Sequence, residues 1–562
     1  MIASRVSKKT SNNPSQTASR ILRPAWVVAV SLAVVGVYGA VADDASNSPA
    51  QMDLRLVDIQ QMVMRQNDEI QMRLYDAEAS ERMYRAERGI FEPNFVGGVN
   101  YSDLTRPNDR QQTAQLGFFA RNIYLEQNTT YNSAIEFLLG TGAKIRTGYL
   151  LREMNNNIGA PEDNPRKWVG KQYESFAGIN LTQPLLKNGW SATSAKIRMA
   201  AISSKIAFQE YRRQILLVMA GAEAAYWDLR LSQDQTRIGA ASLEVAEKIL
   251  RDNKARAEVG KSSELEVIQA QAGVADRKAR FDQARQTSFD YASKLSTLYS
   301  RTTTPGAPLP RAVDQPVLVD EPLQAIESYE AAFKQNPDYL IRREQVEQEH
   351  LRVSYMKNQR LPQLDLQSSF GLNGLGNSPG ASWNDWTHRD YPTWSVGAEF
   401  RVPLGGGIKE KNELAAAKLG KMRALTGLKE AEVQLFNLID ASTRKIQLYR
   451  NNVTNALAVV DFTEKLLKTQ MDRLAVGTTD SKTVLETEDK LREARISVVE
   501  NMVMERKAHL ELETARGSLL ASRDSEIDLI HTRNQMDAVL TRRKQQIPTT
   551  TNGVPATAQP AQ

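Results

Sequence analysis

Two long stretches of the sequence share a stripe of apolar and small side chains, spaced alternately three and four residues apart. The first stripe runs from Ile215 to Leu250 and the second from Leu435 to Leu467, at positions offset by 217 residues. A sustained repeat of about 3.5 residues predicts helices that pack as coiled coils. Because many stripe positions are small or polar, we expect each helix to meet neighbours on two sides, as in a ring of helices.

Both helical patterns stop at a Val-Gly pair and start again within a few residues. The pairs are Val259-Gly260 and Val476-Gly477, and each is preceded by an arginine three residues before the valine. Glycine adopts the left-handed conformation that ends a helix without a steric penalty. The pattern therefore predicts two helical hairpins with tight turns. A plain hairpin turn without a docking role remains an alternative.

Alternating apolar and polar residues follow a helix-ending proline in each half of the chain. The clearest pair of such stretches is 364–372 and 394–404, and fainter counterparts lie at 95–101 and 177–181. Alternation over about ten residues is typical of a membrane β-barrel strand with one face toward lipid and the other toward the lumen. A soluble antiparallel sheet with one solvent-exposed face gives the same pattern.

Four strands per chain have consequences for assembly. Open sheet edges are not tolerated in lipid, so the membrane interpretation requires several copies to share one barrel. Glu399 and Arg401, at polar positions of the last strand, would then face the barrel lumen. The region 102–174 is longer than its second-half counterpart and contains the strand-like stretch AKIRTGYLLRE. Whether it adds strands or forms an external loop stays open.

These patterns divide the chain into five segments. Residues 1–42 have a basic start, an apolar stretch and a small-x-small site, as in a cleaved signal peptide, with an uncleaved anchor as the alternative. Two repeats, 43–299 and 336–520, each follow the order helix, strands, long helix, Val-Gly turn, helix. We expect the linker 300–335 and the start of 521–562 to form an equatorial segment, and the C-terminal tail to be disordered.

Composition and motifs exclude several classes of function. The net charge of +6 falls to +1 without residues 1–42, so no basic face for nucleic acid is predicted. The chain has no cysteine, and its four histidines lack the spacing of metal ligands. Hydrolase and phosphate-loop motifs are also missing. We therefore predict that the protein is not an enzyme and binds no cofactor or metal.

The sequence resembles the TolC-like outer-membrane efflux protein family from residue 53 to about residue 520. The resemblance is carried by LTQPLL at 181–186, by NPDYL and LPQLDLQSSFG within 336–371, and by the two Val-Gly breaks. It implies an α+β membrane protein: a homotrimer with a twelve-stranded β-barrel, four strands per chain, continuous with a long periplasmic α-helical coiled-coil barrel.

The resemblance also implies a function and partners. The protein would be the outer-membrane channel of a tripartite efflux or type I secretion system, passively conducting substrates from an inner-membrane transporter. Its location would be the bacterial outer membrane, in contact with outer-membrane lipid and spanning into the periplasm. A periplasmic adaptor (membrane fusion) protein would dock at the tips formed by Val259, Gly260, Val476 and Gly477. The alternatives are a periplasmic coiled-coil scaffold without channel activity, and a channel for protein or polysaccharide.

Acidic residues follow the Val-Gly turns in this family and line the narrow entrance. Glu266 and Glu486 occupy matching places, and rings of carboxylates would favour cations. The chain departs from some relatives at Thr479, where they carry a gate-locking arginine, and at Thr483, where they carry an acid. A solvated helix face explains both glutamates equally well.

Overall fold

The computed structural model describes residues 51–107, 123–158, 160–161, 163–164, 166–260, 263–299, 308–318 and 324–523. All of these belong to one compact unit, Pro49–Gln562. The predicted signal peptide and the tail after residue 523 lie outside the described residues. The proposed division of the chain into five segments stays a prediction.

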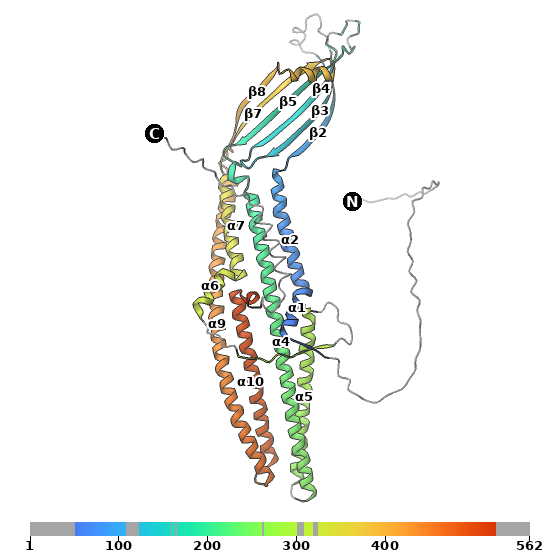
Figure 1. Ribbon diagram of the computed structural model, residues 1–562. Helices are drawn as coiled ribbons and strands as arrows, with labels where there is room; N and C mark the ends of the chain where they lie inside the picture. Colours follow the sequence, from blue (N-terminus) through green and yellow to red (C-terminus); the bar gives the residue numbers. More distant parts are fainter. Residues whose placement is uncertain are drawn as a thin grey trace, which may run out of the picture. The chain divides into compact units, whose positions relative to one another are not determined.

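A six-stranded antiparallel sheet lies at one end of the helices (Figure 1). Its strand order is β2-β3-β4-β5-β7-β8, so neighbours in the chain are mostly neighbours in the sheet. The strands are β2 (Asn94–Pro107), β3 (Ile123–Leu138), β4 (Lys144–Asn156), β5 (Lys171–Pro184), β7 (Gln363–Gly376) and β8 (Pro392–Arg401). A separate parallel pair joins β1 (Gln51–Leu54) to β6 (Leu309–Ala312).

The prediction of four strands per chain, and hence of twelve in a trimer, is wrong for this chain. The four expected strands are present, although Val402 and Leu404 lie beyond the end of β8. The region 102–174 supplies two more, and the stretch left open by the sequence lies in β4. Alternation is weak in β3 because Thr129 and Ser133 occupy the face that is apolar in the other strands.

Two long helices leave the sheet and return as shorter ones. The long helices are α4 (Ala195–Glu258) and α9 (Ile408–Ala475), and the returning ones are α5 (Glu264–Tyr299) and α10 (Ser481–Arg516). Two further helices, α2 (Asp68–Arg88) and α7 (Pro337–Gln359), lead into the first strand of each half. Asparagine caps both: Asn67 accepts from Glu69 and Ile70, and Asn336 from Tyr339.

Short helices connect these elements. They are α1 (Leu56–Gln66), α6 (Ala325–Gln335), α8 (Pro379–Thr387) and α11 (Leu519–Ser522), together with 3₁₀ turns at Gly89–Phe91 and Trp190–Ala192. None of the described helices combines the length and the apolarity needed to cross a membrane.

The predicted helical stripe is buried in both halves. In α9, every buried residue after Ala417 belongs to the stripe: Leu435, Ile439, Ser442, Ile446, Val453 and Leu467. In α4 the stripe from Ile215 to Leu229 belongs to the largest hydrophobic cluster, and Ser232 is buried as well. This helix contacts α2 and α7 in one half of its length and α5 and α10 in the other. The expectation that a helix meets neighbours on two sides is therefore confirmed for α4.

Candidate functional site

The two Val-Gly turns form the tips of the helical hairpins, at the end of the helices remote from the sheet (Figure 1). Gly260 and Gly477 have φ angles of 72° and 77°, the left-handed conformation that glycine adopts without strain. The valine that precedes each glycine is exposed, Val259 by 67% and Val476 by 75%. Each tip thus presents an exposed apolar side chain to whatever lies beyond it.

An aspartate that the sequence analysis did not single out caps the helix after the second tip. The Asp480 carboxylate accepts hydrogen bonds from the Thr483 backbone N (3.0 Å) and from the Thr483 hydroxyl. These bonds hold the pKa of Asp480 below its usual value, the hydroxyl contributing most. The threonine at a position where some relatives carry an acid is therefore part of a helix cap. The sequence signal for this helix cap is an Asp directly before a helical pattern.

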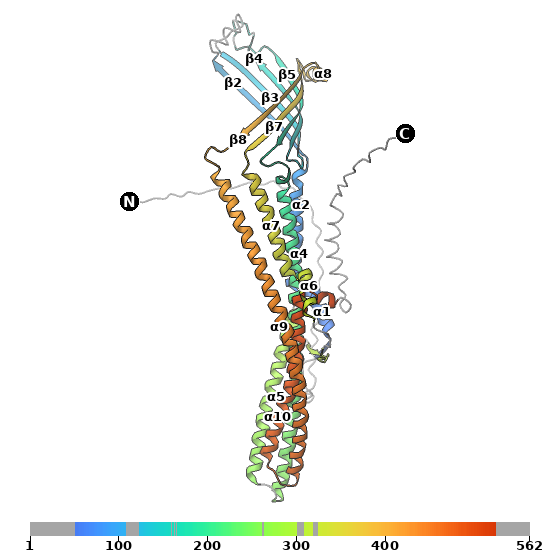
Figure 2. The ribbon, with the colours of Figure 1, turned by 90° about the vertical axis from the view of Figure 1, so that its left-hand side faces the viewer.

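The two hairpins are bound to each other near the tips, side by side in both views (Figures 1 and 2). Arg256 Nη1 of α4 donates to the Leu474 carbonyl of α9 at 2.6 Å. Asn253 Nδ2 of α4 donates to Ser481 Oγ of α10 at 2.7 Å, and both side chains are buried. These bonds join segments more than 200 positions apart, so periodicity within one helix could not reveal them.

A buried ion pair lies further from the tips and joins three helices. Arg277 Nε of α5 lies 2.9 Å from Glu488 Oε2 of α10, with side-chain exposures of 7% and 6%. Ser242 of α4 donates to the same carboxylate oxygen at 2.9 Å. Arg277 also donates to the Leu485 carbonyl at 2.8 Å. Because the charges are paired and hydrogen-bonded, their burial is compatible with a folded helical bundle.

A second, more exposed carboxylate continues this network. Asp489 Oδ1 lies 3.2 Å from Arg280 Nη1 of α5 and 3.0 Å from Arg492 Nε of α10. Burial raises the pKa of Asp489, but hydrogen bonding and charge from Arg492, with smaller contributions from Arg280 and Arg277, lower it below its usual value overall. The carboxylate is thus held in its charged form, which favours its ion pair with Arg280 of the other hairpin.

The predicted entrance glutamates lie on different hairpins. Glu266 is in the first turn of α5 and is half-buried, and its carbonyl accepts from Asn253 Nδ2 at 3.4 Å. Glu486 is exposed on α10 and lies 3.8 Å from Lys482. A ring of either residue requires several copies of the chain, so their role at an entrance stays a prediction.

The sheet has one apolar and one polar face, and of the described helices only the short α8 lies against the apolar face. The apolar face is defined by side chains that the strand register brings into line: Phe95, Val99, Tyr131, Ile135, Tyr149, Ile179, Phe370, Leu372, Trp394, Val396 and Phe400. Most of them are exposed, including Phe95, Trp394 and Val396 by about two thirds or more. A patch of this size on a protein surface marks an interaction with lipid or protein.

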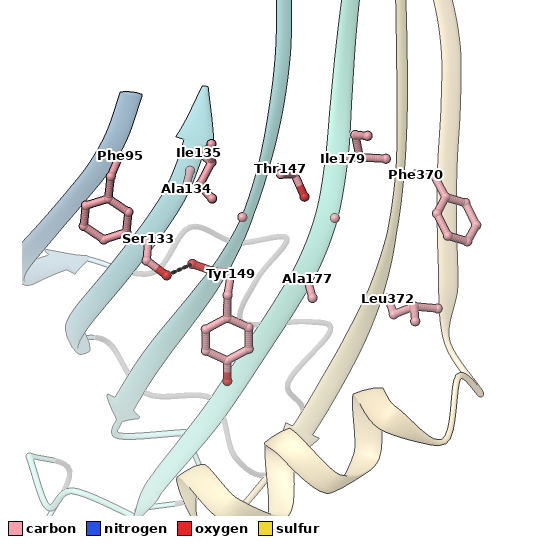
Figure 3. A pocket seen from close by; sticks show the side chains of 12 residues that line it. Phe95, Ser133, Ala134, Ile135, Thr147, Tyr149, Ala177, Ile179, Phe370 and Leu372 are labelled. Carbon is pink, nitrogen blue, oxygen red and sulfur yellow. Dashed lines mark hydrogen bonds between the residues drawn. The ribbon is translucent and has the colours of Figure 1, made fainter. Parts of the chain in front are cut away.

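A shallow groove of about 560 Å³ crosses the apolar face (Figure 3). Phe95 and Phe370 stand at its sides, while small residues such as Ala177 form its floor. Nearby, α8 lies against this face, held by a hydrogen bond between Ser382 and Ser175 (2.7 Å). Its tryptophans pack around Tyr149, with ring centroids 5.1 Å apart for Trp383 and 6.4 Å for Trp386. Such aromatic clusters are typical of membrane–water interfaces.

On the polar face, oppositely charged side chains of neighbouring strands form ion pairs. Arg146 lies 3.4 Å from Glu136, and Arg152 lies 3.2 Å from Glu174. The two residues predicted to line a barrel lumen are on this face: Glu399 lies 2.5 Å from Arg401 and accepts from Gln367 at 2.8 Å. The lumen assignment itself depends on a closed barrel and remains a prediction.

The outer membrane efflux protein family model matches residues 167–299, which contain β5, α4, the first tip and α5. The matched part of the chain is therefore similar to outer membrane efflux proteins. A curated relative, the pyoverdine export outer membrane protein OpmQ of Pseudomonas aeruginosa, is 22% identical over 404 residues, which are 66% of this chain and 77% of OpmQ. The family match and this relative support an outer membrane location.

Solved outer membrane channels share the fold. The CmeC channel of Campylobacter jejuni is similar with a TM-score of 0.57 and 16% identity, over 82% of this chain and 85% of CmeC. The VceC protein of Vibrio cholerae is similar with a TM-score of 0.58 and 15% identity, over 82% of this chain and 96% of VceC. The family and these neighbours are channel proteins rather than enzymes.

Proposed function

We propose that three copies of this protein form the outer-membrane channel of a tripartite efflux or type I secretion system. The channel would passively conduct substrates delivered by an inner-membrane transporter. The observation that carries this proposal is the largely uncovered sheet, apolar on one face and polar on the other, in which β2 and β8 have no partner on their outer edges among the described residues. An outer membrane supplies the lipid that such an apolar face requires, and other copies supply the missing edge partners.

The helical hairpins would extend the channel into the periplasm and end at the tips. We infer that the exposed Val259 and Val476, at the two left-handed turns, contact a periplasmic adaptor protein. The network of Arg256, Asn253 and the Arg277–Glu488 pair would hold the two hairpins of one chain together in the closed state. Loosening these contacts would widen the entrance.

A periplasmic scaffold that conducts nothing is the competing function. A scaffold would keep its sheet in water, where the exposed aromatic side chains of the apolar face promote aggregation. The outer membrane location and the Tyr149, Trp383 and Trp386 cluster favour the channel. The relative OpmQ is a pyoverdine export protein. We propose export for this chain as well, without transferring that substrate.

Ion selectivity tests the proposed channel and its acidic entrance together. Replacing Glu266 and Glu486 by Gln removes the carboxylates that would ring the entrance, so the cation-to-anion permeability ratio should fall by about threefold or more. The measurement is the reversal potential across a planar bilayer under a salt gradient, with purified wild-type and variant protein.

The matched control for this experiment is Glu493→Gln, which removes an exposed carboxylate further along α10 and should leave the ratio unchanged. An unchanged ratio in the double variant would remove Glu266 and Glu486 from the entrance while leaving the channel. Absence of any current from the wild type would contradict the proposed function and favour the scaffold.

A further inference from the structure

The chain between β2 and β5 leaves and re-enters the sheet at the same end. β2 follows α2 and runs away from the helices, while β5 runs back toward them and leads into α4 (Figure 1). The inserted β3 and β4 therefore form one complete hairpin, running toward the helices and away again. A hairpin inserted at this place keeps every neighbouring pair antiparallel, as the sheet shows.

The hairpin is an integral part of the sheet. β3 pairs with every residue of β2, from Asn94↔Glu136 to Pro107↔Ile123, and β4 pairs with β5 along most of its length, from Lys144↔Thr182 to Asn155↔Lys171. Consequently β2 and β5 are separated by two strands and do not touch in this sheet. The strand register places the side chains of β3 and β4 in line with those of β5, so the apolar and polar faces of the sheet continue across the hairpin.

The turn of the hairpin is fixed to the end of β5 and to the first residues that follow it. The Thr141 carbonyl accepts from Trp190 N at 2.8 Å and from Gln183 Nε2 at 3.1 Å. Gly142 has a φ of 89°, and a Cβ at this position would lie 2.7 Å from both the Asn188 carbonyl and Thr193 Oγ1. Glycine is therefore needed here, and the turn cannot move away from the sheet as a free loop would.

The two edges of the sheet are suited to each other. β8 runs toward the helices and ends in α9, so it is antiparallel to β2, which runs away from them. Trp394 and Val396 of β8 lie on the same face as Phe95 and Val99 of β2. Joining β8 of one copy to β2 of the next therefore continues both faces, and rotation by equal steps closes a ring.

We infer that three copies close an eighteen-stranded β-barrel through β8–β2 pairing, six strands coming from each chain. This inference rests on the proposed trimeric channel. Barrel diameter grows roughly linearly with strand number, and porins of about 16–18 strands leave an aqueous channel. The diameter of the barrel is thus about 1.5 times that of a twelve-stranded barrel. It admits large hydrated solutes, and the helix tips, not the barrel, set the limit on solute size.

Disulfide scanning across the edges tests this pairing, because the chain has no cysteine of its own. Asn100→Cys on the polar face of β2 is combined in turn with Thr393→Cys, Ser395→Cys, Gly397→Cys and Glu399→Cys on the polar face of β8. One or two neighbouring combinations should give covalent dimers and trimers, and nothing larger, on a denaturing gel after mild oxidation in membranes. Asn100→Cys with Val396→Cys, whose side chain lies on the apolar face, should not cross-link.

Counting strands by electron microscopy of the wild-type protein in lipid nanodiscs completes the test without any substitution. Eighteen strands around a three-fold axis, together with trimeric cross-linking, are the expected result. A conducting trimer with twelve strands, or cross-linking that stops at the dimer, overturns the inference but not the channel. Protein that neither cross-links nor conducts overturns the proposed function itself.

Discussion

Replacing Phe370 by Arg is expected to prevent the protein from assembling in the outer membrane. Phe370 lies in the middle of β7, on the apolar face, with 52% of its surface exposed. In a lipid-facing position near the bilayer centre, an arginine costs about 2–4 kcal/mol in each copy, and a trimer carries this cost three times. Trimers that resist dissociation in detergent should therefore be lost from the membrane fraction.

The neighbouring residue provides a matched control. Ser369 points to the polar face, where its hydroxyl lies 2.7 Å from that of Ser395. Ser369→Arg introduces the same charge at the same depth but into the proposed aqueous lumen, so trimers should persist. Phe370→Leu, which keeps the position apolar, should also assemble. If Phe370→Arg gives normal trimers, or if both arginine variants fail alike, the apolar face does not meet lipid.

Truncating Glu488 to Ala should both destabilise the helical hairpins and open the channel. The substitution leaves Arg277 buried without its charge partner, which typically costs about 3–5 kcal/mol. It also removes the acceptor for Ser242 of α4. Since these contacts join α10 to α4 and α5, we expect a lower unfolding temperature and a larger single-channel conductance than in the wild type.

A double substitution separates stability from gating. Arg277→Met with Glu488→Leu removes both charges, so no unpaired charge stays buried and most of the stability should return. The Ser242 bond and the Arg277 bond to the Leu485 carbonyl are still lost, so the conductance should remain raised. A destabilised Glu488→Ala channel with wild-type conductance would show that this ion pair does not control the entrance.

The sequence predicted those features that repeat along one element. The helical stripe, the Val-Gly turns and the strands β2, β5, β7 and β8 each have a period or a conformational requirement that a single segment reveals. The strand β3 was missed because its apolar positions include Thr129 and Ser133, which reduce the contrast between its faces. The chain also offered no second copy of this hairpin for comparison, since β7 and β8 are joined through α8 instead.

The contacts that bind the hairpins together lay beyond sequence reasoning for a different reason. Glu488 is one of many acidic residues on a charged helix, and only the packing of α10 against α4 and α5 identifies it as buried. The same holds for Asn253 and Ser481, whose pairing depends on how the two hairpins are aligned along their helix axes. By contrast, the cap at Asp480 is a local feature and was within reach of the sequence.

The most direct test of the central claim asks whether the tips and the sheet lie on one conduction path. Single-channel current is recorded in planar bilayers from three single-cysteine variants of the cysteine-free chain, before and after a bulky thiol reagent. Modification of Glu486→Cys at the narrow tips should reduce the current strongly. Modification of Ser395→Cys in the wide lumen should reduce it less, and Val396→Cys on the apolar face should leave it unchanged. A wild-type protein without current, or a current insensitive to the reagent at both Glu486→Cys and Ser395→Cys, would contradict the account.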